Sequence, residues 1–236
     1  MKLLARIQSW LSPDHARNQG SDDKVKLSPY HQLLNTPAAE LTDKQKRSQL
    51  SGAIHWRNEA RIDELLSVDT VFLSKPAKYA SRTWLAEAVY SDCGISIFEK
   101  LLAAGCDPNA YLKSPKESRP LEIAIDKDNL DAVAWLLAND ANPNLGRPIV
   151  GAVNHEKSPE TQLELLRMLL DGGANVNQTF PLFGDEDNQF TVLDWAELYE
   201  VSASVRQFLV ARGATHNWTS ETIRESKGEL KTRRIV

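Results

Sequence analysis

The sequence contains little cysteine: Cys93 and Cys106 are the 2 cysteines among 236 residues. Small secreted domains held by disulfides carry several pairs, and neither cysteine has partners at the spacing of a zinc site. The sequence therefore gives no sign of a disulfide framework. We expect both thiols to be free in a cytoplasmic protein, with Cys106 acting as a small buried apolar residue behind the end of a helix.

The chain also lacks a strong charge of one sign. It has 28 Lys and Arg residues against 32 Asp and Glu residues, a formal net charge of −4. Proteins that bind nucleic acid neutralise phosphates with a basic surface, which this balance does not provide. The residues from Thr219 onward include several basic side chains, but Glu221, Glu225 and Glu229 dilute them. Nucleic acid is therefore not expected as a partner.

The common motifs of catalysis are missing as well. The sequence contains no glycine-rich phosphate loop, no nucleophile elbow and no H-E-x-x-H motif. Its five histidines are scattered, and none pairs with cysteine or carboxylate at metal-ligand spacing. The run from Asp185 to Asp187 lacks the spaced oxygen ligands of a calcium loop. We expect neither an enzyme nor a bound metal or cofactor.

A short turn that ends in asparagine occurs four times and is the strongest pattern present. The four copies are Gly105-Cys106-Asp107-Pro108-Asn109, Asp140-Ala141-Asn142-Pro143-Asn144, Gly173-Ala174-Asn175-Val176-Asn177 and Gly213-Ala214-Thr215-His216-Asn217. Their closing asparagines are 35, 33 and 40 residues apart, which fits the period of a stacked helical repeat. The pattern predicts a repeat protein whose function lies on a surface.

Each turn follows apolar residues at helix spacing, such as Ile97, Leu101 and Leu102, which predict a helix with one buried face. Upstream stand the opening motifs Thr83-Trp84-Leu85-Ala86-Glu87-Ala88, Arg119-Pro120-Leu121-Glu122-Ile123-Ala124, Arg147-Pro148-Ile149-Val150-Gly151-Ala152 and Thr191-Val192-Leu193-Asp194-Trp195-Ala196. These resemble the T-P-L-H-x-A opening of ankyrin repeats. The resemblance implies an all-α ankyrin-repeat solenoid of helix-turn-helix repeats with short hairpin loops and a helical N-terminal cap.

One position departs from the ankyrin pattern. The histidine of the motif is replaced by Ala86, Glu122, Val150 and Asp194. In the family this histidine makes a hydrogen bond between repeats. Its replacement predicts that the bond is lost and that the repeats stack less regularly.

The resemblance and the composition divide the chain into four parts. We expect an N-terminal helical segment with linker and cap at residues 1–48, a degenerate capping repeat at 49–80, four ankyrin-like repeats at 81–218 and a C-terminal tail at 219–236. In the first part, Leu3 to Leu11 form an amphipathic helix too short to span about 30 Å of hydrocarbon. This helix is expected to dock on the first repeat, or alternatively to lie on a membrane surface.

In ankyrin repeats the ends of the first helices line the concave face beside the hairpin tips. The resemblance therefore implies a contact surface made of Tyr90, Ser91, Asp126, Lys127, Asn154, His155 and Tyr199. Two long connections are expected to add Tyr111, and Phe180, Phe183, Asp185 and Asp187. Exposed aromatic side chains are typical of binding surfaces. Alternatively, the hairpin rings fold back over the base of their own hairpin.

These features favour a non-catalytic module that binds another protein through its concave face and extended hairpins. One specific version is a bacterial-type immunity protein, whose acidic hairpin would face a basic toxin or enzyme. Another is a membrane-peripheral scaffold anchored by the N-terminal amphipathic helix. Trp84, Trp135 and Trp195 are expected in the core, and Trp218 is expected to cap the last repeat.

Overall fold

The computed structural model describes residues 36–75, 82–112, 118–182 and 185–218. The chain divides into two units, Met1–Thr36 and Pro37–Val236, and the description below concerns the second. The predictions made for the amphipathic helix from Leu3 to Leu11, for the linker and for the tail after Trp218 lie outside the described residues.

Ten α-helices of the described segments form five consecutive pairs. The pairs are α3 (Asp43–His55) with α4 (Glu59–Val68), α5 (Trp84–Tyr90) with α6 (Ile95–Ala103), α7 (Pro120–Asp126) with α8 (Leu130–Ala138), α9 (Pro148–Ala152) with α10 (Pro159–Asp171), and α11 (Val192–Leu198) with α12 (Ala203–Ala211). Two 3-10 helices, η2 (Ala38–Glu40) and η3 (Val71–Ser74), pack on the first pair.

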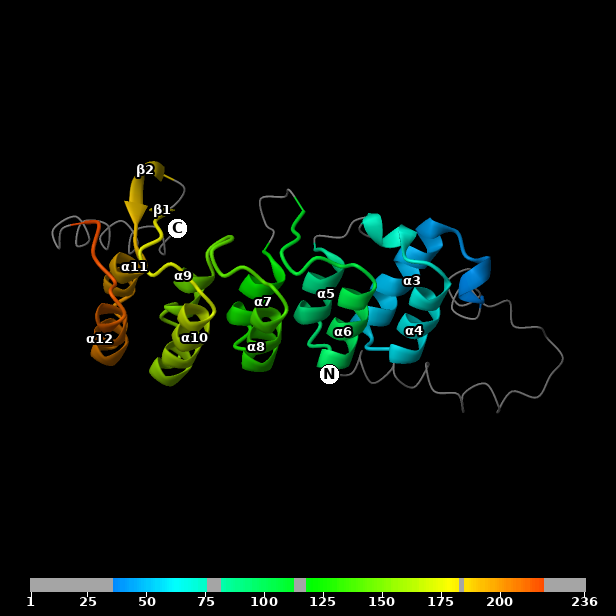
Figure 1. Ribbon diagram of the computed structural model, residues 1–236, viewed down its shortest axis with the longest axis horizontal. Coiled ribbons are helices and arrows are strands. Elements are labelled where there is room, and N and C mark those ends of the chain that lie inside the picture. The colour runs from blue at the N-terminus through cyan, green and yellow to red at the C-terminus, as the bar shows by residue number, and fades with distance from the viewer. Residues whose placement is uncertain (1–35, 76–81, 113–117, 183–184, 219–236) are drawn as a thin grey trace, which may run out of the picture. The chain divides into compact units, whose positions relative to one another are not determined.

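The helix pairs stack on one another in chain order (Figure 1). The two helices of a pair contact each other, and each first helix contacts the next, from α3 through α5, α7 and α9 to α11. Among the second helices, α4 contacts α6, while α8, α10 and α12 form a continuous row. The predicted helix-turn-helix solenoid is therefore confirmed.

The second helices end in the turns that the sequence repeats. After α6, Gly105 adopts a φ of +93°, and the Cys106 N–H donates to the Leu101 carbonyl at 3.0 Å. This left-handed ending satisfies carbonyl groups that the last helical turn leaves without an intrahelical partner. Gly173 and Gly213 take the same conformation, and so does Asp140, where the sequence lacks glycine.

The core is built from equivalent positions of the repeats. Leu101, Leu136, Leu169 and Leu209 are each fully buried at the same place in their helices. Truncating one to alanine would cost about 2–5 kcal/mol, because the close-packed neighbours fill the cavity only in part. The apolar residue that follows each of these leucines is less buried: Leu102, Leu137 and Leu170 are half-buried, and Val210 is exposed.

The closing asparagines join each repeat to the next. The Asn109 side chain accepts from the Asn142 N–H at 2.7 Å and donates to the Asp140 carbonyl at 2.8 Å. Asn144 makes the same two bonds to the Asn175 N–H and the Gly173 carbonyl, 2.7 and 3.0 Å long. Asn177 repeats the pattern with the final turn. The asparagines therefore form a hydrogen-bonded ladder along one side of the stack.

Two carboxylates replace the histidine bonds of the opening motif. Glu122 Oε1 accepts from the Arg147 N–H of the next repeat at 2.8 Å, and its Oε2 accepts from the Arg119 N–H at 2.9 Å. Asp194 accepts from the Asn217 N–H at 3.0 Å, so it holds the terminal turn. The expectation that the bond is lost is therefore wrong at both positions, because carboxylate oxygens accept what the histidine would have bonded.

The long connection before α11, expected as an extended hairpin, forms a two-stranded β-hairpin. Strands β1 (Phe180–Leu182) and β2 (Asp185–Phe190) pair antiparallel, with Phe180 opposite Phe190. Phe180 is only 4% exposed, and Phe190 is fully buried against Trp195 and Trp218, with ring centroids 5.9 and 6.0 Å apart. The expectation of an exposed Phe180 ring is wrong, because the rings cover the base of their own hairpin.

Trp218 lies where the sequence places a cap. Its indole N–H donates to the Gln189 carbonyl of β2 at 2.6 Å. The tryptophans expected in the core are buried at Trp84 and Trp195, whereas Trp135 is half-buried against Phe98.

The first helix pair lies largely within residues 49–80, where the sequence predicts a degenerate capping repeat, and α3 begins earlier, at Asp43. Thr42 caps α3 by accepting from the Gln45 N–H, and the Gln45 side chain accepts from the Thr42 N–H in return. This reciprocal arrangement satisfies two N–H groups that the first turn leaves free. The polar residues 43–48 at the start of this region are therefore helical.

Candidate functional site

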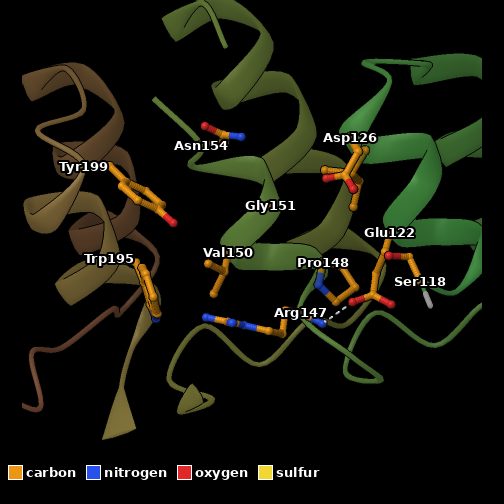
Figure 2. Close-up of a pocket in the computed structure, with 11 residues that line it drawn as sticks. Ser118, Glu122, Asp126, Arg147, Pro148, Val150, Gly151, Asn154, Trp195 and Tyr199 are labelled. Carbon is orange, nitrogen blue, oxygen red and sulfur yellow. Dashed lines mark hydrogen bonds between the residues drawn. The ribbon is translucent and has the colours of Figure 1, made fainter. Parts of the chain in front are cut away.

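A groove is lined by the first helices of three neighbouring repeats, α7, α9 and α11, and by residues that flank these helices (Figure 2). Its volume is about 330 Å³. The lining residues are Ser118, Glu122, Ile125, Asp126, Arg147, Pro148, Val150, Gly151, Asn154, Trp195 and Tyr199. We refer to it as the Arg147 groove.

The groove exists because one repeat lacks a side chain. Gly151 occupies the fifth position of its opening motif, where the other repeats carry Glu87, Ile123 and Trp195. A Cβ at Gly151 would lie 3.3 Å from Cγ2 of Ile125, closer than most side-chain contacts. Glycine therefore lets α9 approach α7 closely and leaves the floor of the groove open.

Arg147 is the cation of the groove. Its backbone N–H is held by Glu122, and its guanidinium lies 4.8 Å from the Trp195 ring centroid and 5.8 Å from that of Phe180. Within the described part of the chain, the guanidinium makes no hydrogen bond or ion pair. Partial burial lowers the pKa of Arg147, but a guanidinium stays protonated in proteins. Its N–H donors are therefore available to a ligand.

Gly146 positions Arg147 relative to Glu122. Its φ is +76°, a region that favours glycine, and a Cβ there would overlap the Glu122 carboxylate. The residue before Arg147 must therefore be glycine for Glu122 to accept from the Arg147 N–H. Because both Glu122 oxygens accept backbone N–H groups, this carboxylate is engaged by the fold.

Asp126 supplies a negative charge at the end of α7, across α9 from Trp195 (Figure 2). Its carboxyl makes no hydrogen bond or ion pair to any residue that the structure describes. Burial raises the pKa of Asp126, nearby Lys157 lowers it, and Glu122 and Asp128 raise it further. Lys157 itself is engaged, since its ammonium donates to the Ile125 carbonyl at 2.7 Å and to Asp128.

Tyr199 forms the aromatic wall of the groove on the α11 side. Its ring lies 5.4 Å from the Trp195 ring and 5.4 Å from that of His155, measured between centroids. Aromatic pairs at such distances hold one another in defined orientations. The wall is therefore rigid, with His155 at its outer edge, where it is exposed.

Three of the sequence-predicted residues line the groove: Asp126, Asn154 and Tyr199. Tyr90 and Lys127 lie outside it. Tyr90 is 48% exposed and has the Arg82 guanidinium 3.5 Å and the Lys127 ammonium 5.3 Å from its ring centroid. These two residues form a second exposed cluster on the ends of the first helices.

Ser91 and Tyr111 do not line the groove. The Ser91 carbonyl accepts from Arg57 Nε at 2.8 Å, a contact between repeats. Tyr111 is 46% exposed and stacks with Arg119, whose guanidinium lies 4.2 Å from the ring centroid. Phe183 lies outside the described residues. Asp185 and Asp187 belong to β2, but the structure does not describe their side chains.

Sequence reasoning missed Arg147 and Gly151. Both stand inside the opening motif, whose residues are expected to serve stacking. The available signal was the glycine at a position where three other motifs carry a large side chain. Such an exception within a repeat indicates a local cavity, and the residues around the cavity become candidates for binding.

The described residues contain no group of three His, Cys, Asp or Glu side chains that could hold a metal ion. Both cysteines are free, as predicted, and burial raises the pKa of Cys93 to about 11 and that of Cys106 to about 12. Across the same segments, none of the helices has the length and apolar character needed to cross a bilayer.

The paired helices, the left-handed turns and the asparagine ladder define this chain as an ankyrin-repeat protein in fold. A solved structure with a similar arrangement is the human ASB11 ankyrin repeat domain, which is 20% identical, with a TM-score of 0.48, over 70% of this chain and 69% of that one. No family model and no curated protein matches the sequence. The repeat geometry itself, rather than this likeness, carries the assignment of the fold.

Proposed function

We propose that the chain is a non-catalytic module that binds a partner protein through the ends of its first helices, with the Arg147 groove at the centre of the contact. The observation that carries this proposal is an open groove holding an arginine and an aspartate whose charged groups make no hydrogen bond or ion pair to any described residue. Unpaired charges beside aromatic side chains are typical of binding centres, where arginine and tyrosine are enriched.

The neighbouring cluster of Tyr90 and Lys127 extends this surface to the preceding repeat. Tyr90 is exposed while cations hold its ring in place, so it can contact a partner at a small cost in side-chain entropy. Because stacked repeats contact mainly their neighbours, a surface that crosses several repeats presents a long row of side chains. Such a row suits another polypeptide better than a small molecule.

The two specific versions of this function depend on other parts of the chain. Neutralisation of a basic toxin relies on Phe180, Phe183 and the acidic run of β2, and of these Phe180 is buried. Membrane anchoring relies on residues 1–12, which the structure does not describe. We therefore propose the general binding function and leave both versions as predictions.

Partner binding is tested by co-purification followed by calorimetry. The tagged full-length chain is used to isolate a partner, which is identified by mass spectrometry, expressed separately and titrated against wild type, Arg147→Ala and Tyr199→Ala. Each groove variant should weaken binding about tenfold or more if its residue is a hot spot. Arg167→Ala is the matched control, because Arg167 is a half-exposed arginine on α10 outside the groove.

Equal affinities for the groove variants and wild type would contradict the proposal. If the purified partner binds both groove variants and the Arg167→Ala control as tightly as wild type, the contact lies elsewhere. Circular dichroism spectra and melting curves of each variant must match those of wild type for this comparison to hold.

A further inference from the structure

The Arg147 groove presents two charges of opposite sign that make no hydrogen bond or ion pair to a residue the structure describes. The other ionic groups around it are engaged: Glu122 accepts two backbone N–H groups, and Lys157 donates to Ile125 and Asp128. Arg147 and Asp126 have no such partners among the described residues. A ligand that fills the groove therefore meets one cation and one anion.

The aromatic rings prepare Arg147 for a carboxylate. Its guanidinium lies near the faces of Trp195 and Phe180, and both rings are buried and fixed by the hairpin and α11. An arginine held in this way loses less side-chain freedom on binding, and its planar fork matches the two oxygens of a carboxylate. A lysine at the same position would offer a point charge without this geometry.

The acidic side chains of the groove argue against a phosphate or another ligand of purely negative charge. Asp126 and Glu122 line the same cavity as Arg147 and would repel such an anion. A ligand that carries a cation beside its carboxylate would instead gain at both walls. The volume of about 330 Å³ holds a few side chains and not a folded domain.

We infer that the Arg147 groove takes an extended segment of the partner protein, in which one acidic side chain pairs with Arg147 and a nearby basic side chain pairs with Asp126. This inference rests on the proposed function and adds the chemistry of the segment to it. The charge complementarity of the two walls, on a floor left open by Gly151, selects this occupant.

The test uses random linear peptides displayed on phage and the full-length chain as bait, so it needs no identified partner. Wild type should enrich peptides in which an acidic and a basic residue lie close together. Arg147→Glu should lose the preference for the acidic residue, and Asp126→Lys should lose the preference for the basic one. Arg167→Glu, which makes the same charge change outside the groove, should select the wild-type sequences.

Synthetic versions of the selected peptides give the quantitative readout by fluorescence polarisation. Arg147→Glu should weaken binding of the acidic peptide about tenfold or more, since a charge-assisted contact becomes a repulsion. Replacing the acidic residue of the peptide by lysine should restore binding to Arg147→Glu. This exchange identifies a direct contact, which a general loss of stability would not reproduce.

Three results would overturn the inference: selection of no peptide by wild type, selection of peptides without paired charges, or equal binding to wild type and Arg147→Glu. Failure of the proposed function is a separate result. If the isolated partner still loses affinity on Arg147→Ala while no linear peptide binds, the groove contacts a folded surface, and only the inference about an extended segment fails.

Discussion

Removing the Asp194 carboxylate should loosen the last repeat selectively. Asp194 is fully buried at the start of α11, and its Oδ2 accepts from the N–H groups of Thr191 and Asn217 at 2.9 and 3.0 Å. Its Oδ1 lies 2.8 Å from Nδ1 of His216. One side chain therefore joins the helix start to the terminal turn.

The size of the effect follows from the groups that lose their acceptor. In Asp194→Ala the Thr191 N–H is left buried and unsatisfied, which costs about 1–3 kcal/mol. The bonds to Asn217 and His216 are closer to solvent, where water replaces them in part, so they add about 1 kcal/mol together. We expect a total loss of about 2–4 kcal/mol.

The variant Asp194→Asn keeps a side-chain oxygen that can accept hydrogen bonds but removes the negative charge. The asparagine oxygen can still accept from both N–H groups, and its amide stays within reach of Nδ1 of His216. This variant should lose only about 1 kcal/mol, because hydrogen bonds to an ionised group are stronger than neutral ones. Aspartate, asparagine and alanine should therefore rank in that order of stability.

Hydrogen exchange with mass spectrometry is the appropriate assay, because stacked repeats can unfold separately from one end. Faster exchange is expected in α11 and α12, with little change in α7 and α8. Urea unfolding followed by circular dichroism gives the corresponding global change. Equal exchange of wild type and Asp194→Ala, or an asparagine variant as unstable as the alanine variant, would refute the reasoning.

Three other predictions concern the ladder, an ion pair and the thiols. Asn144→Ala should destabilise the protein in urea by about 1–2 kcal/mol, because two solvent-exposed hydrogen bonds to the next repeat are lost. The hydrogen bond from Lys46 lowers the pKa of Asp69. This pair therefore contributes fully to the stability of the folded state above about pH 4, and the contribution is lost as the pH falls further. Asp69→Asn should show a smaller loss of stability on acidification than wild type. Burial raises the pKa values of Cys93 and Cys106 to about 11 and 12, so at pH 8 they should react with Ellman's reagent roughly a hundredfold and roughly a thousandfold more slowly, respectively, in the folded protein than in urea.

Much of the fold could be predicted from the sequence because stacking repeats its local rules. The recurring turns mark where second helices end, and the apolar spacing identifies Leu101 and Leu136 as core. The partners of the closing asparagines could not be predicted in this way, since Asn109 bonds to a turn more than thirty residues away. That contact depends on how two repeats dock.

The candidate site was harder to predict than the fold, because repeated local rules do not describe it. A regular repeat uses its polar groups for stacking, as Glu122 does when it holds Arg119 and Arg147. The repeat that opens at Arg147 departs from this pattern at Gly151. Gly151 lacks the side chain that would fill the floor, and the guanidinium of Arg147 contacts the Trp195 and Phe180 rings but makes no hydrogen bond or ion pair to a described residue.

This relation gives a general way to read a degenerate repeat protein. Residues that match their counterparts in other repeats, such as Leu169 and Asn177, are explained by burial and by the ladder. Departures need a separate explanation. Some serve structure by another route, as Asp194 does in holding the terminal turn. Gly151 has no structural gain of that kind beyond letting α9 approach α7, and the cavity that it opens is bordered by Arg147 and Asp126. The departure that leaves charged groups unpaired is therefore where binding should be sought first.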